Sequence, residues 1–458
     1  MDENQNKAQE EQEGKNGVER APAPVKNEKK LKIWRMVACV AGAVAIAATG
    51  FVTGMCVRWY SIDPQMRTLI AVKEKIDAHY YEEVTDETFY GTLFGAVNQQ
   101  ILDGYSGYMT PEEYASLTSD LNGNRAGLGL VLLTQSHTGE EQMFVTRVCG
   151  NSPAEKAGIS VGSYVVGFGK SADSITLSQN YDVFSEFLTD YDAGEKFYIR
   201  VVTGEEEKTV EISREEYVEN YVFYRANDGG YAFETSGDCQ EIKNGDVLSC
   251  LKEDEAYIRI VQFTGNAEKA FAQAMQLFKQ EGKKHLILDL RGNGGGYLEA
   301  MQGIASYFCK DATGIRPVVA IADYGEKQEK FHADKNVYDD YFFSDSRICV
   351  LADEESASAS ECLLGCMLDY GAIDYEDICL TEYGGKAKTF GKGIMQTTYL
   401  VNALEGDAIK LTTAKILWPV SKNCIHGRGV LAADGTKTVA RDYEGENELV
   451  NAIKSLLR

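Results

Sequence analysis

The order of apolar and polar positions divides the chain into stretches of different periodicity. Residues 36–57 form an uncharged, mostly apolar run, and the polar residues 1–33 before it predict a disordered tail. Residues 64–84 and 86–102 repeat apolar side chains at intervals of three and four, which predicts two helices. The N-terminal quarter of the chain is therefore expected to be helical.

Beyond residue 126 the pattern changes twice. Up to about residue 215, short apolar runs separated by Gly, Asn, Ser and Asp predict a β-rich domain with one helical insert. From residue 256 onward, strands alternate with helices, which predicts an α/β fold with a mixed, largely parallel sheet. Residues 216–255 have no clear pattern and receive no assignment. The expected strands are 256–263, 285–290, 316–322 and 347–352, and the expected helices are 266–281, 297–309 and 359–370.

The apolar run is long enough to cross a bilayer, which takes about 20 residues. Five basic residues lie between positions 26 and 35, whereas Arg58 stands almost alone after the run. The positive-inside rule therefore predicts one transmembrane helix at 34–58, a cytoplasmic N-terminus, and residues 59–458 outside a bacterial cell membrane. The alternative is a signal sequence cleaved near residues 45–47.

Composition narrows the classes of function. Of 458 residues, 44% are hydrophobic, so most of the chain can bury a core, and the formal net charge is −24. A nucleic-acid surface needs clustered Lys and Arg, so this charge argues against nucleic-acid binding. Nine of the eleven cysteines follow the apolar run, without a C-x-x-C pair or zinc-ligand spacing. We expect them to be buried as small hydrophobic side chains, although an oxidising exterior would favour pairing.

A glycine-rich turn follows the strand expected at 285–290. Residues 291–296 read Arg-Gly-Asn-Gly-Gly-Gly and open a helix. Such a turn exposes backbone N–H groups and predicts either an oxyanion hole or a structural tight turn. A phosphate-binding loop is the third interpretation, but the lysine motif G-x-x-x-x-G-K-[ST] is absent.

A run of alternating serines follows the strand expected at 347–352. Ser356, Ser358 and Ser360 precede an apolar helix, and Ser358 with Glu361 matches a capping box. The serine is therefore either a helix cap or a nucleophile whose developing oxyanion benefits from the helix N-terminus.

A serine nucleophile needs a base, and none of the five histidines lies in a recognisable triad motif. Lys392, flanked by glycines in a segment of strand character, is the other candidate. Burial would lower the pKa of a lysine, so that it accepts the serine proton. On a regular strand Lys392, Ile394 and Gln396 would share one face, and Gln396 could orient the lysine nitrogen. Taken alone, the segment also fits an exposed edge strand.

Together these segments resemble the C-terminal processing peptidases, or tail-specific proteases, over about residues 65–439. The motifs are LILDLRGNGGG, SASASE, TFGKGIMQ and LTTAKILWP, in this order. The resemblance implies a serine endopeptidase with Ser358 as nucleophile, Lys392 as general base and Gln396 beside it. It implies oxyanion donors in the backbone of Gly294, Gly295, Gly296 and Ala359, and supporting roles for Glu361, Asp369 and Thr389.

The β-rich region resembles a PDZ domain of the peptidase type. The resemblance implies that the turn of Gly127, Leu128, Gly129 and Leu130 captures a substrate's C-terminal carboxylate while the tail adds a strand. The expected organisation is a tail at 1–33, a transmembrane helix at 34–58, helices at 61–125, a PDZ domain at 126–215 and a peptidase core at 216–458. Protein tails are the expected partners, and no metal, nucleotide or other cofactor is implied.

Some positions depart from the family pattern. Ser163 stands where the family usually has Asp, and about nine residues, 374–382, are expected as an insertion between Asp369 and Thr389. The C-terminal motif also differs, at residues 429–435. A second hypothesis is therefore a PDZ scaffold whose peptidase core binds without cleaving.

Overall fold

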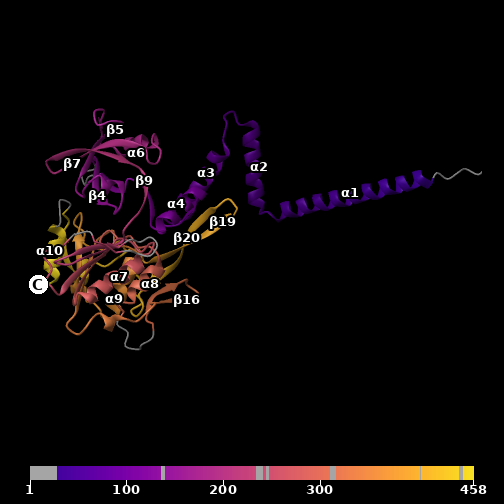
Figure 1. Cartoon of the computed structure of the whole chain (residues 1–458). Helices are drawn as coiled ribbons and strands as arrows, with labels where there is room; N and C mark the ends of the chain where they lie inside the picture. The colour runs from indigo at the N-terminus through magenta and orange to yellow at the C-terminus, as the bar shows by residue number, and fades with distance from the viewer. Residues whose placement is uncertain are drawn as a thin grey trace, which may run out of the picture. The chain divides into compact units, whose positions relative to one another are not determined.

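The structure is a computed structural model, shown in Figure 1. It describes residues 28–135, 140–233, 241–243, 247–309, 316–402, 404–442 and 447–457. The chain divides into two compact units, one ending at Gly91 and the other running from Thr92 to Arg458. The domain limits expected from the sequence are finer than this division and stay predictions.

The first unit is helical, as the periodicity predicts. Helix α1, Glu28–Ser61, contains a 22-residue stretch, Lys32–Thr53, of mean hydropathy 2.1 that is not buried within the protein. By length and composition this stretch fits either a membrane span or a signal sequence. Helix α2 is Pro64–His79, with Asp63 capping its N-terminus. Helix α3, Asp86–Ala96, begins in this unit and ends in the second.

The β-rich region forms a six-stranded antiparallel sheet in the order β3-β4-β5-β7-β8, with β6 paired to β5. Strand β3 lies at the edge of this sheet. The chain enters and leaves the region through paired strands, β2 (Asn124–Gly127) and β9 (Glu215–Val218). Helices α5 (Pro153–Lys156) and α6 (Tyr181–Thr189) complete it. The strands are β3 Leu130–Gln135, β4 Glu141–Val148, β5 Tyr164–Gly169, β6 Thr176–Leu177, β7 Lys196–Thr203 and β8 Glu206–Ser213.

The C-terminal half is built on an eight-stranded sheet in the order β12-β11-β10-β13-β14-β17-β18-β21. Its five strands from β13 to β21 are parallel, and β10, β11 and β12 are antiparallel, so the mixed sheet is confirmed. The strands are β10 Val222–Arg225, β11 Gly230–Phe233, β12 Glu241–Lys243, β13 Glu255–Ile260, β14 His285–Asp289, β17 Arg347–Ala352, β18 Ile378–Glu382 and β21 Lys437–Ala440.

Helices cover both faces of this sheet, because successive residues of a buried strand point to opposite sides. Leu286 and Leu288 of β14 join the core formed with α7, α8 and α9, whereas Ile287 between them packs with α10. Helix α8 packs between α7 and α9, and Figure 1 shows the three together. The helices are α7 Ala267–Gln280, α8 Leu298–Ala305, α9 Ala359–Asp369 and α10 Asn447–Leu456.

A second sheet is antiparallel and holds the segment after the predicted lysine. Its order is β1-β20-β15-β16, and β19 pairs with β20. The strand expected at 316–322 lies here, as β15, and not in the parallel sheet; its partners β16 and β20 run antiparallel to it. The bounds are β1 Gly107–Met109, β15 Val318–Asp323, β16 Gln328–His332, β19 Ile394–Asn402 and β20 Asp407–Leu417, with α4 at Pro111–Leu121.

The expected insertion at 374–382 is wrong as an added loop. These residues contain β18, a buried strand between β17 and β21 in the parallel sheet. The cysteines follow the expectation of burial in six cases among the described residues. The buried ones are Cys149, Cys309, Cys349, Cys362, Cys366 and Cys379.

Candidate active site

Ser358 occupies a strained turn between β17 and α9. Its φ of 57° and ψ of −112° make it one of three non-glycine residues with positive φ in the described chain. Such a conformation costs on the order of 1–3 kcal/mol and persists only where the surroundings enforce it. The strain marks Ser358 as a candidate functional residue independently of any motif.

The other two serines of the run hold the turn in place. Ser356 Oγ donates to the carbonyl of Leu290 at 2.8 Å, and Ser360 Oγ donates to the carbonyl of Asn293 at 2.8 Å. Both side chains are fully buried, whereas Ser358 is partly exposed. The structure therefore separates one reachable hydroxyl from two structural ones.

The glycine-rich turn lies directly against Ser358. Gly295 has a φ of +104°, and a Cβ built there would lie 2.8 Å from Ser358 Cβ. Its N–H donates to Asn293 Oδ1 at 3.0 Å, so this donor is already occupied. In the part of the chain that the structure describes, no hydrogen bond occupies the N–H groups of Gly294, Gly296 or Ala359. These three remain the candidate oxyanion donors, and Gly295 acts through its small size.

Glu361 joins the nucleophile turn to the lysine segment. Its carboxylate accepts from the backbone N–H of Ser358 at 3.1 Å and of Lys392 at 2.8 Å. It also accepts from the N–H of Gly391 at 2.8 Å and from Thr389 Oγ1 at 2.6 Å. Burial raises the pKa of this carboxyl group, and the four hydrogen bonds oppose that shift. Only the glutamate half of the predicted capping box is made, because the Ser358 hydroxyl forms no cap hydrogen bond.

Lys392 lies just before β19, not within it. Its flanking glycines allow close packing, since a Cβ on Gly393 would lie 2.7 Å from the backbone nitrogen of His426. Burial lowers the pKa of Lys392, and repulsion from Lys410 lowers it further. The Nζ lies 5.5 Å from the centre of the Tyr105 ring. The lysine therefore has the environment that a neutral base requires.

Gln396 lies within β19, whereas Lys392 precedes that strand. The lysine segment becomes regular strand only at Ile394, and a register shift separates Met395 from Gln396. Gln396 Nε2 is buried without a hydrogen-bond partner in the described structure. The residue that the register shift leaves unpaired is Thr413 of the partner strand β20. A role beside the lysine stays a prediction.

The two other supporting residues lie in different places. Thr389 is fully buried and connects Glu361 to the backbone N–H of Val430, which it accepts at 2.8 Å. Asp369 ends α9, at the opposite end of the helix from Ser358, and accepts from the N–H groups of Val420 and Ser421. Thr389 therefore supports the site directly, whereas Asp369 stabilises a turn remote from it.

The predicted carboxylate turn has the required backbone. A Cβ on Gly129 would lie 2.0 Å from Ser152 Cβ, and φ there is +79°, so only glycine fits. The carbonyls of Leu128 and Gly129 accept from Ala154 and Cys149, and in the described residues nothing occupies their N–H groups. Gly127 pairs with Glu215, and Leu130 begins edge strand β3.

Two residues that contact the site, Asn293 and Tyr105, were not predicted from the sequence. Asn293 fixes Gly295 through Oδ1 and donates Nδ2 to the carbonyl of Ile260 at 2.8 Å, fully buried. A lone polar side chain among glycines was the available signal. Tyr105 reaches Lys392 from a loop almost 290 residues earlier, and no local pattern indicates that contact.

Comparison with known proteins gives consistent results. Residues 254–433 match the sequence model of peptidase family S41. A CtpA-like serine protease of Staphylococcus epidermidis is 26% identical over 422 residues, covering 89% of this chain and 74% of the relative. One from Staphylococcus aureus is 27% identical over 409 residues, covering 87% and 72%. An S41 protease structure from Bacteroides fragilis matches in fold, with a TM-score of 0.51 and 13% identity over 82% of this chain and 90% of that one.

Proposed function

The chain is a serine peptidase of family S41, and from that premise we propose that it cleaves proteins near their C-termini with Ser358 as nucleophile and Lys392 as general base. The observation that carries this proposal is the Glu361 carboxylate, which binds the backbone N–H of both residues. One buried group thus fixes the relative position of nucleophile and base.

The reaction follows from these positions. Neutral Lys392 accepts the proton of Ser358 Oγ as the oxygen attacks the scissile carbonyl carbon. The developing oxyanion is stabilised by N–H groups of Ala359, Gly294 and Gly296, which have no other partner among the described residues. The protonated lysine then donates to the leaving amine, which departs as the acyl-enzyme forms. Lys392 next deprotonates a water molecule, whose attack releases the new C-terminus.

The test uses the full chain and a fluorescently labelled, unfolded casein. We expect Ser358→Ala and Lys392→Ala each to abolish cleavage, with the folded state retained by circular dichroism. His426→Ala is the matched control, because His426 lies beside the lysine segment but has no assigned role. Retained cleavage in Lys392→Ala would contradict the lysine base, and no cleavage by the wild type would favour the non-cleaving scaffold.

The β-rich region supports substrate capture at residues 126–215. Its turn offers free N–H groups beside the edge strand β3, which is the arrangement needed for an added strand ending in a carboxylate. Leu128 is buried in the core of this region, so the turn is anchored. Binding of a protein's C-terminal tail here is part of the proposal.

The apolar stretch of α1 supports membrane anchoring with the catalytic unit outside the cell. Protease added to intact cells should then digest residues beyond 61 and leave the basic N-terminal segment. A soluble form that lacks this helix would show instead that the stretch is a cleaved signal.

A further inference from the structure

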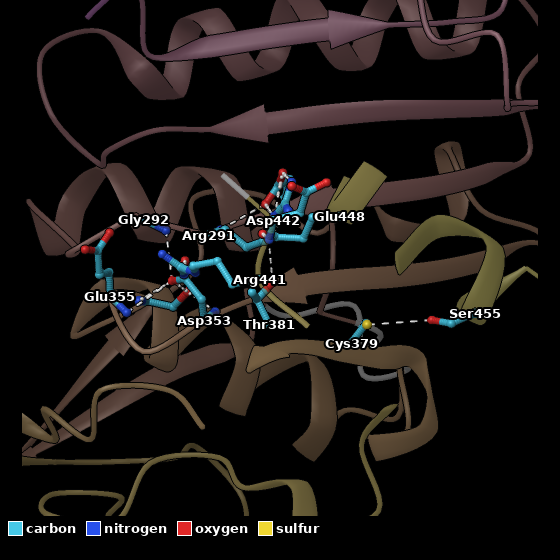
Figure 2. A network of polar contacts seen from close by, with 12 residues as sticks. Arg291, Gly292, Asp353, Glu355, Cys379, Thr381, Arg441, Asp442, Glu448 and Ser455 are labelled. Atoms are coloured by element: carbon cyan, nitrogen blue, oxygen red, sulfur yellow. Dashed lines mark hydrogen bonds and ion pairs between the residues drawn. The ribbon is translucent and has the colours of Figure 1, made fainter. Parts of the chain in front are cut away.

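One buried carboxylate lies between the glycine-rich turn and the serine turn. Asp353 Oδ1 accepts from the N–H of Gly292 at 2.9 Å and from the N–H of Ser356 at 3.1 Å. It also accepts from the N–H of Glu355 at 3.1 Å and contacts Ser356 Oγ at 3.2 Å. Figure 2 shows the contacts of Gly292 and Glu355 with Asp353. The same oxygen thus joins the loop of the oxyanion donors to the loop of the nucleophile.

The other carboxylate oxygen is bound by a distant arginine. Arg441 Nη2 lies 2.6 Å from Asp353 Oδ2, and only 14% and 4% of the two side chains are exposed. Arg441 directly follows β21, and its N–H donates to the carbonyl of Glu382 at the end of β18. Because β17, β18 and β21 are parallel, their carboxyl ends meet at one edge of the sheet. That edge is where both loops lie.

We propose that Arg441 is a positioning residue for the peptidase reaction, acting through Asp353; the inference rests on the proposed Ser358 chemistry. With Arg441 in place, Asp353 is neutralised and directed toward the backbone of both loops. Without it, no ion pair among the described residues neutralises a carboxylate that is 3% exposed, which is strongly unfavourable. Water or a proton must then reach Asp353, and the loops lose their common anchor.

A second tether acts on the same turn from its other side. Arg291 Nη1 lies 2.6 Å from Glu448 Oε1, and its Nη2 lies 2.6 Å from Asp289 Oδ2. Thr381 Oγ1 donates to Glu448 Oε1 at 2.7 Å (Figure 2). The C-terminal segment therefore contacts the glycine-rich turn through Glu448 and the serine turn through Arg441 and Asp353. It supplies no group to the proposed reaction itself.

Arg347, the first residue of the strand that precedes Asp353, provides a matched control. Arg347, at the opposite end of β17 from Asp353, pairs with Asp377 at 2.9 Å, with 38% and 19% of the side chains exposed. Arg441→Gln and Arg347→Gln each remove one arginine–aspartate pair, at opposite ends of β17. We expect kcat on labelled casein to fall roughly 10- to 100-fold in Arg441→Gln with KM little changed, because small misplacements of reacting groups cost that much. Arg347→Gln should keep its kcat.

A double variant separates charge from shape. Arg441→Gln combined with Asp353→Asn removes both buried charges and permits an amide–amide hydrogen bond in their place. We expect it to recover kcat relative to Arg441→Gln, which a general loss of stability would not produce. Equal kcat in Arg441→Gln and Arg347→Gln would overturn the proposal.

A readout independent of activity keeps the two proposals distinguishable. Amide hydrogen exchange should become faster in peptides containing Gly292 and Ser356 in Arg441→Gln, and stay unchanged there in Arg347→Gln. Unchanged exchange in Arg441→Gln would overturn the positioning role even if no casein is cleaved. Both proposals would be supported if the wild type cleaves casein, Ser358→Ala does not cleave it, and Arg441→Gln cleaves it much more slowly.

Discussion

Lys392 has two influences that disfavour its charged form. Burial is the larger and Lys410 on β20 is the second, while the Glu361 carboxylate acts in the opposite sense. The Tyr105 ring covers Nζ. Because the folded pKa lies below that of the unfolded chain, the unfolded state binds this proton more strongly between the two values. The contribution of Lys392 to the free energy of unfolding therefore rises with pH across that range.

The same balance predicts a pH dependence for catalysis. Activity should rise with pH as Lys392 loses its proton and then level off. Lys410→Gln removes the repulsion, so the pKa of Lys392 should increase and the rising limb of kcat/KM should move to higher pH. Lys415→Gln, on the same strand, is the control and should leave the limb in place, since Lys415 is not among the groups that shift Lys392. An unmoved limb in Lys410→Gln would contradict this electrostatic account.

At this scale short motifs indicate the proposed reacting groups, whereas they do not indicate the residues that support them. Ser358, Lys392 and Glu361 follow from short motifs, and the structure brings them together around one carboxylate. The Asp353–Arg441 contact spans 88 residues, so no local pattern indicates it. The occupied N–H of Gly295 depends on the Asn293 rotamer, which a motif does not specify.

Among the elements, the turn between β14 and α8 has a steric requirement that bears directly on Ser358. Gly295 combines a φ of +104° with contact to the nucleophile, since its added Cβ would also lie 2.9 Å from the carbonyl oxygen of Ala357. Backbone strain and steric clash can be separated by comparison with Gly282. That residue has a φ of +67° and open space around it, at the end of α7.

We predict that Gly295→Ala reduces kcat by at least about 100-fold, because the clash must move Ser358 or the oxyanion donors by a fraction of an ångström or more. Gly282→Ala should cost only about 1 kcal/mol of stability through its positive φ and leave kcat unchanged. Steady-state kinetics and thermal unfolding of both variants measure this. A Gly295→Ala enzyme with normal kcat would show that the turn is not adjacent to the reacting atoms.

Helices and strands were predictable from the sequence wherever burial of one face gives a regular spacing of apolar residues. β17 and the three main helices of the core lie within a few residues of their expected bounds. β18 was mistaken for an insertion because its role as a central strand depends on pairing with β17 and β21. β15 was assigned to the parallel sheet because a strand's periodicity says nothing about its partners.

For the molecule as a whole, the proposed function assigns substrate recognition and peptide cleavage to different parts of one chain. The turn that contains Leu128 and Gly129 lies beside edge strand β3, and the reacting groups lie at the edge of the parallel sheet. A substrate longer than the catalytic groove can therefore bind both, whereas a short peptide can fill only one. Linking two binding events makes the second intramolecular and strengthens the first.

If the N–H groups of Leu128 and Gly129 hold a free carboxylate, amidating the C-terminus of an unstructured substrate removes a charge-assisted contact of about 1.5–3 kcal/mol. Affinity for the β-rich region should then fall roughly tenfold or more. Cleavage of the long tail at low concentration should fall comparably, while a short peptide that fills only the groove should be cut at the same rate as acid or amide. Deleting residues 126–215 should remove the difference between acid and amide substrates. Equal cleavage of acid and amide by the intact chain would show that this region recognises something other than the C-terminus, and would leave the Ser358–Lys392 chemistry unaffected.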